Sequence, residues 1–134
     1  MTLANVRLWG GRIVLGLLFV VLLSACAAKF DTNEYSRMVD IRYSLDAVNC
    51  QDPVRARIMA TTVKQHTDWL ALYSQHLPDN SNTQAMVAAL NRSAAGFSAR
   101  YNNATPSPAY CRAKVQNLQA EIDIILKTTG RRPR

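Results

Sequence analysis

The feature that most constrains this chain is an uncharged apolar run near its N-terminus, over residues 13–23. A transmembrane helix needs about 20 apolar residues to cross about 30 Å of hydrocarbon, so this run is short for one. It follows two basic residues, Arg7 and Arg12, and small residues come directly after it. This order is typical of a cleaved signal peptide. We therefore expect residues 1–25 to be removed and the folded domain to lie after them.

The end of this segment resembles a known bacterial signal. Residues 23–26 read Leu-Ser-Ala-Cys, which is similar to the lipobox of bacterial lipoproteins, where signal peptidase II cuts just before the cysteine. The resemblance implies a covalent diacylglycerol and an N-acyl chain on Cys26, and two or more chains give stable anchoring. Ala27 stands where Asp would favour the inner membrane, so the resemblance implies the periplasmic face of an outer membrane. The alternative is an uncleaved N-terminal anchor that contains a cysteine by chance.

The rest of the chain has the pattern of a helical domain. After a tether over residues 26–32, we expect four helices that are joined by short connections: about 33–49, 53–78, 83–101 and 108–130. Thr32 or Asn33 caps the first helix, and Asp52-Pro53 and Ser107-Pro108 each place a capping residue before a proline at the first helical position. No segment alternates with a two-residue period. The sequence therefore predicts an all-α, up-down-up-down four-helix bundle over residues 33–130, followed by a basic tail, 131–134.

Each predicted helix carries an apolar stripe at helical spacing. The second helix is the broadest, since Met59, Val63 and Leu70 extend its apolar face sideways, which indicates contact with two neighbours. The predicted stripes, in chain order, are Tyr35, Met38, Arg42, Leu45 and Val48; Val54, Ile58, Trp69, Leu72 and Tyr73; Met86, Val87, Leu90, Ala94 and Phe97; and Cys111, Val115, Leu118, Ile122, Ile125 and Leu126.

The cysteines give an independent constraint. With Cys26 lipidated, Cys50 and Cys111 are the cysteines that remain, and an oxidising periplasm favours a disulfide over a metal site or a nucleophile. Cys50 closes the first helix and Cys111 begins the last, so an antiparallel bundle places both at the same end. The predicted disulfide clamps the first helix to the last and contributes about 4 kcal/mol in the chain-entropy model.

The same topology places both termini at the opposite end, next to the membrane. The tail residues Arg131, Arg132 and Arg134 would then lie near phospholipid headgroups, where each charge contributes about 1 kcal/mol at an anionic surface. The alternative is a solvated, frayed tail.

The titratable residues suggest no catalytic or metal site. His66 and His76 are ten residues apart, so they do not form the i, i+4 pair of a metal-binding helix. Glu121 and Asp123 are two residues apart and diverge on a helix. Residues 26–134 carry 14 basic and nine acidic side chains, a net charge of +5, but an exported domain is not expected to meet nucleic acid. We expect no enzyme activity and no cofactor besides the lipid on the cysteine.

Two pairs of residues are candidates for binding a partner. Trp69 and Tyr73, one turn apart, either anchor a partner or lie in the core. Arg55 and Arg57 either recognise an acidic partner or are solvated surface charges.

The layout, with its placement of Cys50 and Cys111, resembles the secretin pilotins of the type II secretion system. Those proteins are outer-membrane lipoproteins with a four-helix domain and a disulfide, and they bind the C-terminal segment of a secretin in a helical groove. The resemblance implies a non-catalytic adaptor for a protein of the cell envelope. The alternative function is a phage- or plasmid-encoded lipoprotein for surface or entry exclusion.

Overall fold

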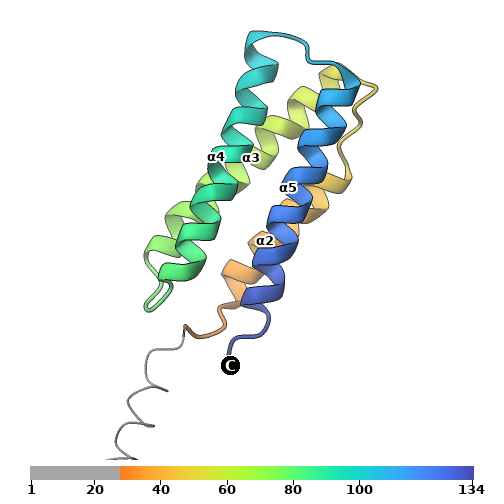
Figure 1. Ribbon diagram of the computed structural model, residues 1–134. Coiled ribbons are helices and arrows are strands. Elements are labelled where there is room, and N and C mark those ends of the chain that lie inside the picture. The colour runs from red at the N-terminus through yellow and green to blue at the C-terminus, as the bar shows by residue number, and fades with distance from the viewer. Residues whose placement is uncertain (1–27) are drawn as a thin grey trace, which may run out of the picture.

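The computed structural model describes residues 28–134, and this part of the chain contains four helices and no strand. The helices are α2 (Thr32–Asp46), α3 (Pro53–Gln75), α4 (Ser81–Asn103) and α5 (Pro108–Thr129). Each helix runs antiparallel to the one before it, and α5 returns to pack beside α2 (Figure 1). The predicted all-α, up-down-up-down bundle is confirmed. The predicted signal peptide, 1–25, and Cys26 lie outside the described residues.

Two helices begin at the predicted capping residues. Asp52 accepts hydrogen bonds from the backbone N–H groups of Val54 and Arg55, both at 3.1 Å, and α3 then starts at a proline. Ser107 accepts one from the backbone of Tyr110 at 3.2 Å, and α5 also starts at a proline. These bonds satisfy N–H groups that have no partner within the helix, which fixes where each helix begins.

The start of α2 differs from the prediction by a small shift. The cap is Asp31 rather than Thr32 or Asn33, and its carboxylate accepts a hydrogen bond from the backbone N–H of Glu34 at 2.7 Å. Aspartate is a strong cap because its charge also favours the positive end of the helix dipole. The cap therefore fixes the last residue of the tether against the bundle.

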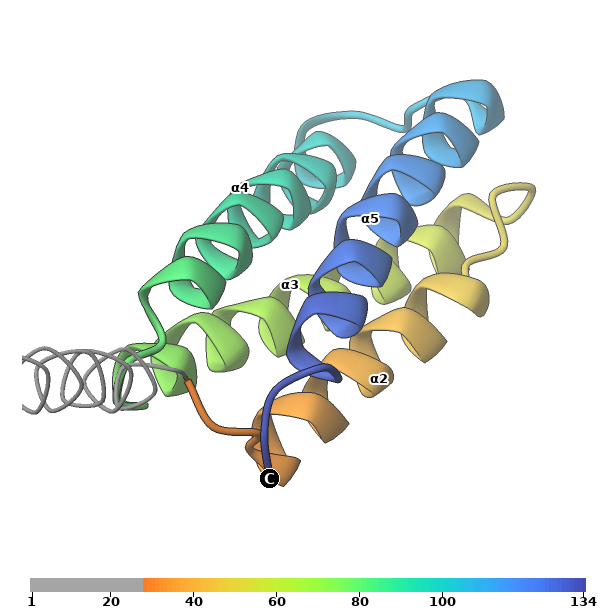
Figure 2. The same ribbon diagram turned by 60° about the horizontal axis from the view of Figure 1, so that its bottom comes forward.

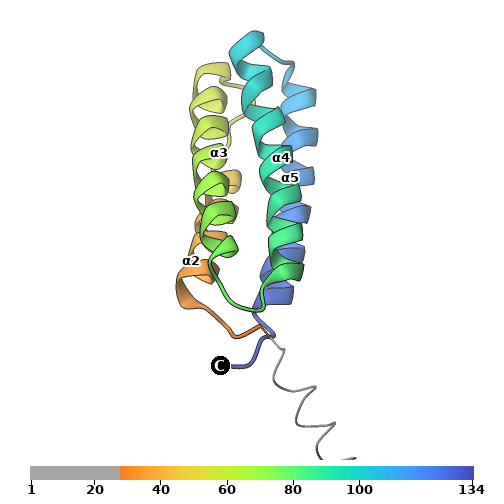
Figure 3. The same ribbon diagram turned by 90° about the vertical axis from the view of Figure 1, so that its left-hand side faces the viewer.

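The disulfide forms as predicted. Cys50 and Cys111 are bonded, their Cα atoms are 5.6 Å apart, and 61 positions of sequence separate them. The bond joins the connection after α2 to the first turn of α5, at the end of the bundle away from the chain terminus (Figure 3). At that end, the bond therefore links α2 to α5 covalently.

α3 turns a different face to the core than its apolar pattern predicts. Val54, Ile58 and Leu72 were expected inside, but they are 67%, 58% and 60% exposed. Small residues predominate on the buried face of α3, which comprises Ala56, Ala60, Val63, Thr67, Leu70 and Ser74. Small side chains let α3 and α4 approach closely along much of their length, whereas larger ones at the same positions would hold the helices apart. The prediction that Val54, Ile58 and Leu72 face the core is therefore wrong, whereas Val63 and Leu70, which were expected to extend the apolar face sideways, are buried.

The remaining stripes are closer to the prediction. In α2, Arg42 is half-buried rather than in the core, and Ile41 is buried instead. Arg42 pairs with Asp46 and, at 2.8 Å, with Asp123 of α5, because a guanidinium is costly to bury without carboxylate partners. α4 and α5 bury the predicted residues Val87, Leu90, Ala94, Phe97, Cys111, Val115, Leu118, Ile122 and Ile125.

Candidate functional site

The exposed apolar residues of α3 form one line along the helix. Val54, Ile58 and Leu72 share this line with Trp69, which is 40% exposed. At 100° per residue, the four side chains lie within about 60° of one another around the helix. We call these four residues the α3 stripe. The stripe consists of two pairs, Val54 with Ile58 and Trp69 with Leu72, and exposed polar residues such as Gln65 lie between the pairs. Large apolar side chains exposed along one face are typical of a surface that binds a partner.

Trp69 is held in place at the contact between α2 and α3. Its ring stacks on that of Tyr73, with centroids 4.7 Å apart and planes 11° from parallel. The guanidinium of Arg37, on α2, lies 4.8 Å from the Trp69 ring centre on a cation–π contact. The hydroxyl of Tyr73 donates to the capping carboxylate of Asp31 at 3.3 Å. Tyr73 is half-buried and Trp69 is exposed, so neither residue lies in the core.

Arg55 and Arg57 lie at the disulfide end of the stripe. They follow Val54 and precede Ile58 by one residue each, so they project on opposite sides of the line. Arg55 is 3.5 Å from Asp52, and its side chain is largely exposed, so solvent weakens this pair. Arg57 is also exposed. The stripe therefore begins between two solvated positive charges.

His66 lies at the α2–α3 contact rather than on the α3 stripe. Burial lowers its pKa from the usual 6.5, and the charge of Arg37 lowers it further, while Asp40 opposes the shift. Its Nδ1 atom is buried and has no hydrogen-bond partner among the described residues. Over residues 28–134, no three His, Cys, Asp or Glu side chains are grouped to hold a metal ion.

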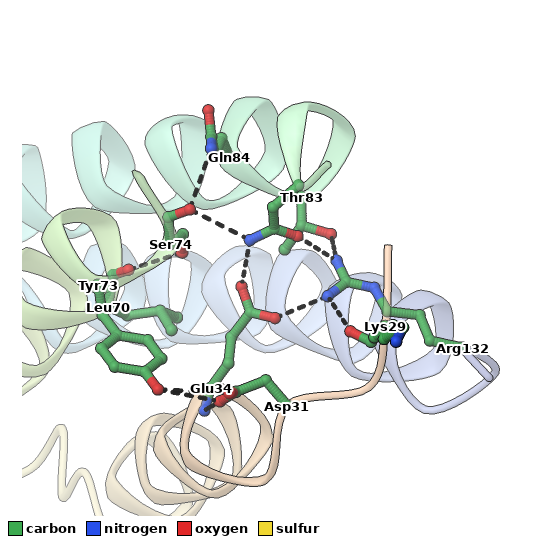
Figure 4. Close-up of polar contacts among 10 residues, drawn as sticks. Lys29, Asp31, Glu34, Leu70, Tyr73, Ser74, Thr83, Gln84 and Arg132 are labelled. Atoms are coloured by element: carbon green, nitrogen blue, oxygen red, sulfur yellow. Dashed lines mark hydrogen bonds and ion pairs between the residues drawn. The ribbon is translucent and has the colours of Figure 1, made fainter. Parts of the chain in front are cut away.

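The opposite end of the bundle holds a buried ion pair. The side chain of Glu34, at the start of α2, is fully buried, and its Oε2 lies 2.8 Å from Nη1 of Arg132. Asn80 donates to the other carboxylate oxygen at 2.8 Å and accepts from Nη2 of Arg132 at 2.6 Å. Thr83 accepts a further hydrogen bond from Arg132 (Figure 4). The network joins the first helix, the α3–α4 connection and the end of the chain.

The arginines of the tail lie in two different environments. The side chain of Arg132 points into the bundle and is only 10% exposed, so its charge pairs with Glu34 in the interior. Arg131 and Arg134 are exposed. The backbone carbonyl of Pro133 accepts a hydrogen bond from the N–H of Phe30 at 2.9 Å, and Arg134 lies over the Phe30 ring. The tail is thus bound to the beginning of the domain (Figure 2).

Sequence reasoning did not identify this network, although one signal was present. Glu34 stands four residues before Met38, and Ile41 and Leu45 continue the same line of buried positions along α2. A carboxylate at such a position is buried with the stripe and needs a charged partner. The partner lies 98 positions away in the chain, so only the tertiary structure shows that it is Arg132.

Within residues 28–134, no helix has the length and apolar character needed to span a bilayer. Comparison with protein families, with curated sequences and with solved structures finds no match to this chain.

Proposed function

We propose that this protein is a non-catalytic lipoprotein, anchored through Cys26 to the periplasmic face of an outer membrane, that docks a protein of the cell envelope on the α3 stripe. The observation that carries the proposal is that α3 turns its larger apolar side chains outward. This helix buries mainly small residues and leaves Val54, Ile58, Trp69 and Leu72 at the surface. Such an arrangement leaves apolar area in water unless another molecule covers it.

The chemistry of the stripe indicates its occupant. Two apolar pairs on the same face, one near each end of α3, fit a second helix that presents apolar residues at two matching positions along its length. The solvated charges of Arg55 and Arg57 at one end favour acidic residues at the matching end of that partner. Trp69 is held by Tyr73 and Arg37, so it loses little side-chain freedom on binding and is the expected hot spot. We therefore infer an amphipathic helical segment with acidic residues at one end.

The proposal is tested by crosslinking in intact cells. A photoreactive amino acid replaces Gln65, an exposed residue between Ile58 and Trp69 on α3. We expect one dominant crosslinked protein, which mass spectrometry identifies. Ile58→Asp should abolish the crosslink, whereas Ile124→Asp on α5 should not, although Ile124 has a similar exposure of 61%.

Binding is then measured with the identified segment. Trp69→Ala should weaken its affinity by about 2 kcal/mol, or roughly 30-fold, as expected for an aromatic hot spot. Equal effects of the two aspartate variants would overturn the docking site. Crosslinks to a second copy of this chain alone would replace the proposed partner by a homodimer. The mass of the N-terminal peptide, which reports the acyl chains on Cys26, tests the anchor separately.

A further inference from the structure

The start of the domain and the end of the chain are bound to each other at one end of the bundle. The N–H of Phe30 donates to the carbonyl of Pro133, and the Phe30 ring lies 5.3 Å from the ring of Tyr35 on α2. Asp31 caps α2, and the Glu34–Arg132 ion pair holds the tail to the same helix. The position of Phe30 on the bundle is therefore fixed from several directions.

This geometry leaves a short tether. Four residue steps separate Cys26 from Phe30, and an extended chain spans at most about 3.6 Å per residue, or about 14 Å in all. If Cys26 carries the anchor, as the proposed function requires, Phe30 lies within this distance of the lipid. The chain between Cys26 and Phe30 is then too short for the bundle to move far from the membrane surface.

The end that the tether brings to the membrane has more exposed basic than acidic side chains. Lys29, Arg131 and Arg134 are exposed there, and so is the carboxylate of Asp79, whereas Glu34 is buried and neutralised by Arg132. A cavity of about 330 Å³ opens beside the tail, lined by residues 28, 79–83, 128 and 131–133. The disulfide end carries exposed arginines as well, so charge alone does not decide which end contacts the membrane. The short tether decides it, because it holds only the end with Phe30 close to the lipid.

We propose that the tether end of the bundle rests directly on the anionic phospholipid headgroups of the anchoring membrane, with Lys29, Arg131 and Arg134 in contact with them. Residues 28–31 and the end of α5 lie at the same end of the bundle (Figure 1), so contact at this end directs the helix axes away from the membrane surface. The 23 residues of α3 span about 34 Å at 1.5 Å per residue. The α3 stripe therefore extends away from the surface, and Arg55 and Arg57 lie at its outer end.

The test uses the full chain, purified in its lipidated form and reconstituted into vesicles. A photoreactive amino acid replaces either Asn82, which lines the tether-end cavity, or Gln116, an exposed residue near the disulfide end. In vesicles that contain phosphatidylglycerol, we expect lipid adducts from position 82 and few from position 116. In pure phosphatidylcholine vesicles the difference should decrease, because the charge attraction is lost.

Charge variants give the second measurement. Each basic residue near an anionic surface shifts the equilibrium between the headgroup-bound and the detached domain about fivefold. R131S/R134S should therefore shift this equilibrium about 25-fold toward the detached domain. R92S/R112S removes the same charge from exposed positions elsewhere and should have little effect. Equal lipid labelling at positions 82 and 116 would overturn the inference while leaving the anchor intact. Absence of acyl chains from the purified protein would instead overturn the proposed function.

Discussion

The buried ion pair at the tether end gives the most direct test of how this fold is held together. In Arg132→Met the side chain keeps much of its length and its apolar contacts but loses its charge. Glu34 then remains fully buried with a hydrogen bond from Asn80 as its remaining polar contact among those described. Arg131, the neighbouring residue, is exposed, so Arg131→Met is a matched control.

The expected loss follows from the burial of both partners. The side chain of Glu34 is 0% exposed and that of Arg132 is 10% exposed, so solvent screens this pair little. Removal of one partner from a buried ion pair costs about 3–5 kcal/mol, because a charge is left in the interior without compensation. A domain of this size has a total stability of about 5–15 kcal/mol. We therefore expect the melting temperature of Arg132→Met to fall by roughly 15–30 °C.

The assay is urea unfolding followed by circular dichroism, with the disulfide intact. The double variant Glu34→Gln/Arg132→Met should recover about 2 kcal/mol, since it removes the buried charge together with its partner. Arg131→Met should unfold like the unmodified protein. The reasoning is refuted if Arg132→Met lies within about 1 kcal/mol of Arg131→Met, the range of an exposed ion pair.

Two further predictions concern other parts of the bundle. Cys50→Ser/Cys111→Ser should lower the free energy of unfolding by about 4 kcal/mol, because the lost bond closes a loop of about 60 residues. A urea titration measures this free energy. A loss below about 1 kcal/mol would contradict the loop argument. His66 should titrate by NMR below the usual pKa of 6.5, and Arg37→Gln should raise its pKa because a nearby positive charge is removed. Since the unfolded chain then binds the proton first, stability should decrease as the pH falls through 6.5 toward the folded pKa. An unchanged His66 pKa in Arg37→Gln would show that the charge of Arg37 does not reach it.

The sequence predicted the parts of the fold that depend on local chemistry. Asp52 and Ser107 each stand before a proline, and both are the helix caps that the structure contains. The disulfide was also predictable, since the alternation of four helices brings Cys50 and Cys111 to the same end. These features follow from neighbouring residues and from the number of helices, so no long-range packing is needed to infer them.

The outward face of α3 could not be inferred in this way. Two lines of apolar residues run along this helix at helical spacing, one that includes Ile58 and Trp69 and one that includes Val63 and Leu70. A count of apolar residues favours the line with the larger side chains. Packing favours the other line, because its small residues, such as Ala60, let α4 lie close. The candidate binding surface is therefore a product of how two helices fit together.

The sequence by itself determined the helices, the caps of α3 and α5 and the pairing of the cysteines, because each depends on residue types at fixed spacing. The tertiary structure alone decided that Trp69 stays at the surface and that Arg132 pairs with Glu34. Both outcomes depend on which side chains from distant parts of the chain can share a close-packed interior. A buried carboxylate is costly without a charged partner, and in this fold the partner of Glu34 is Arg132, far away in the sequence.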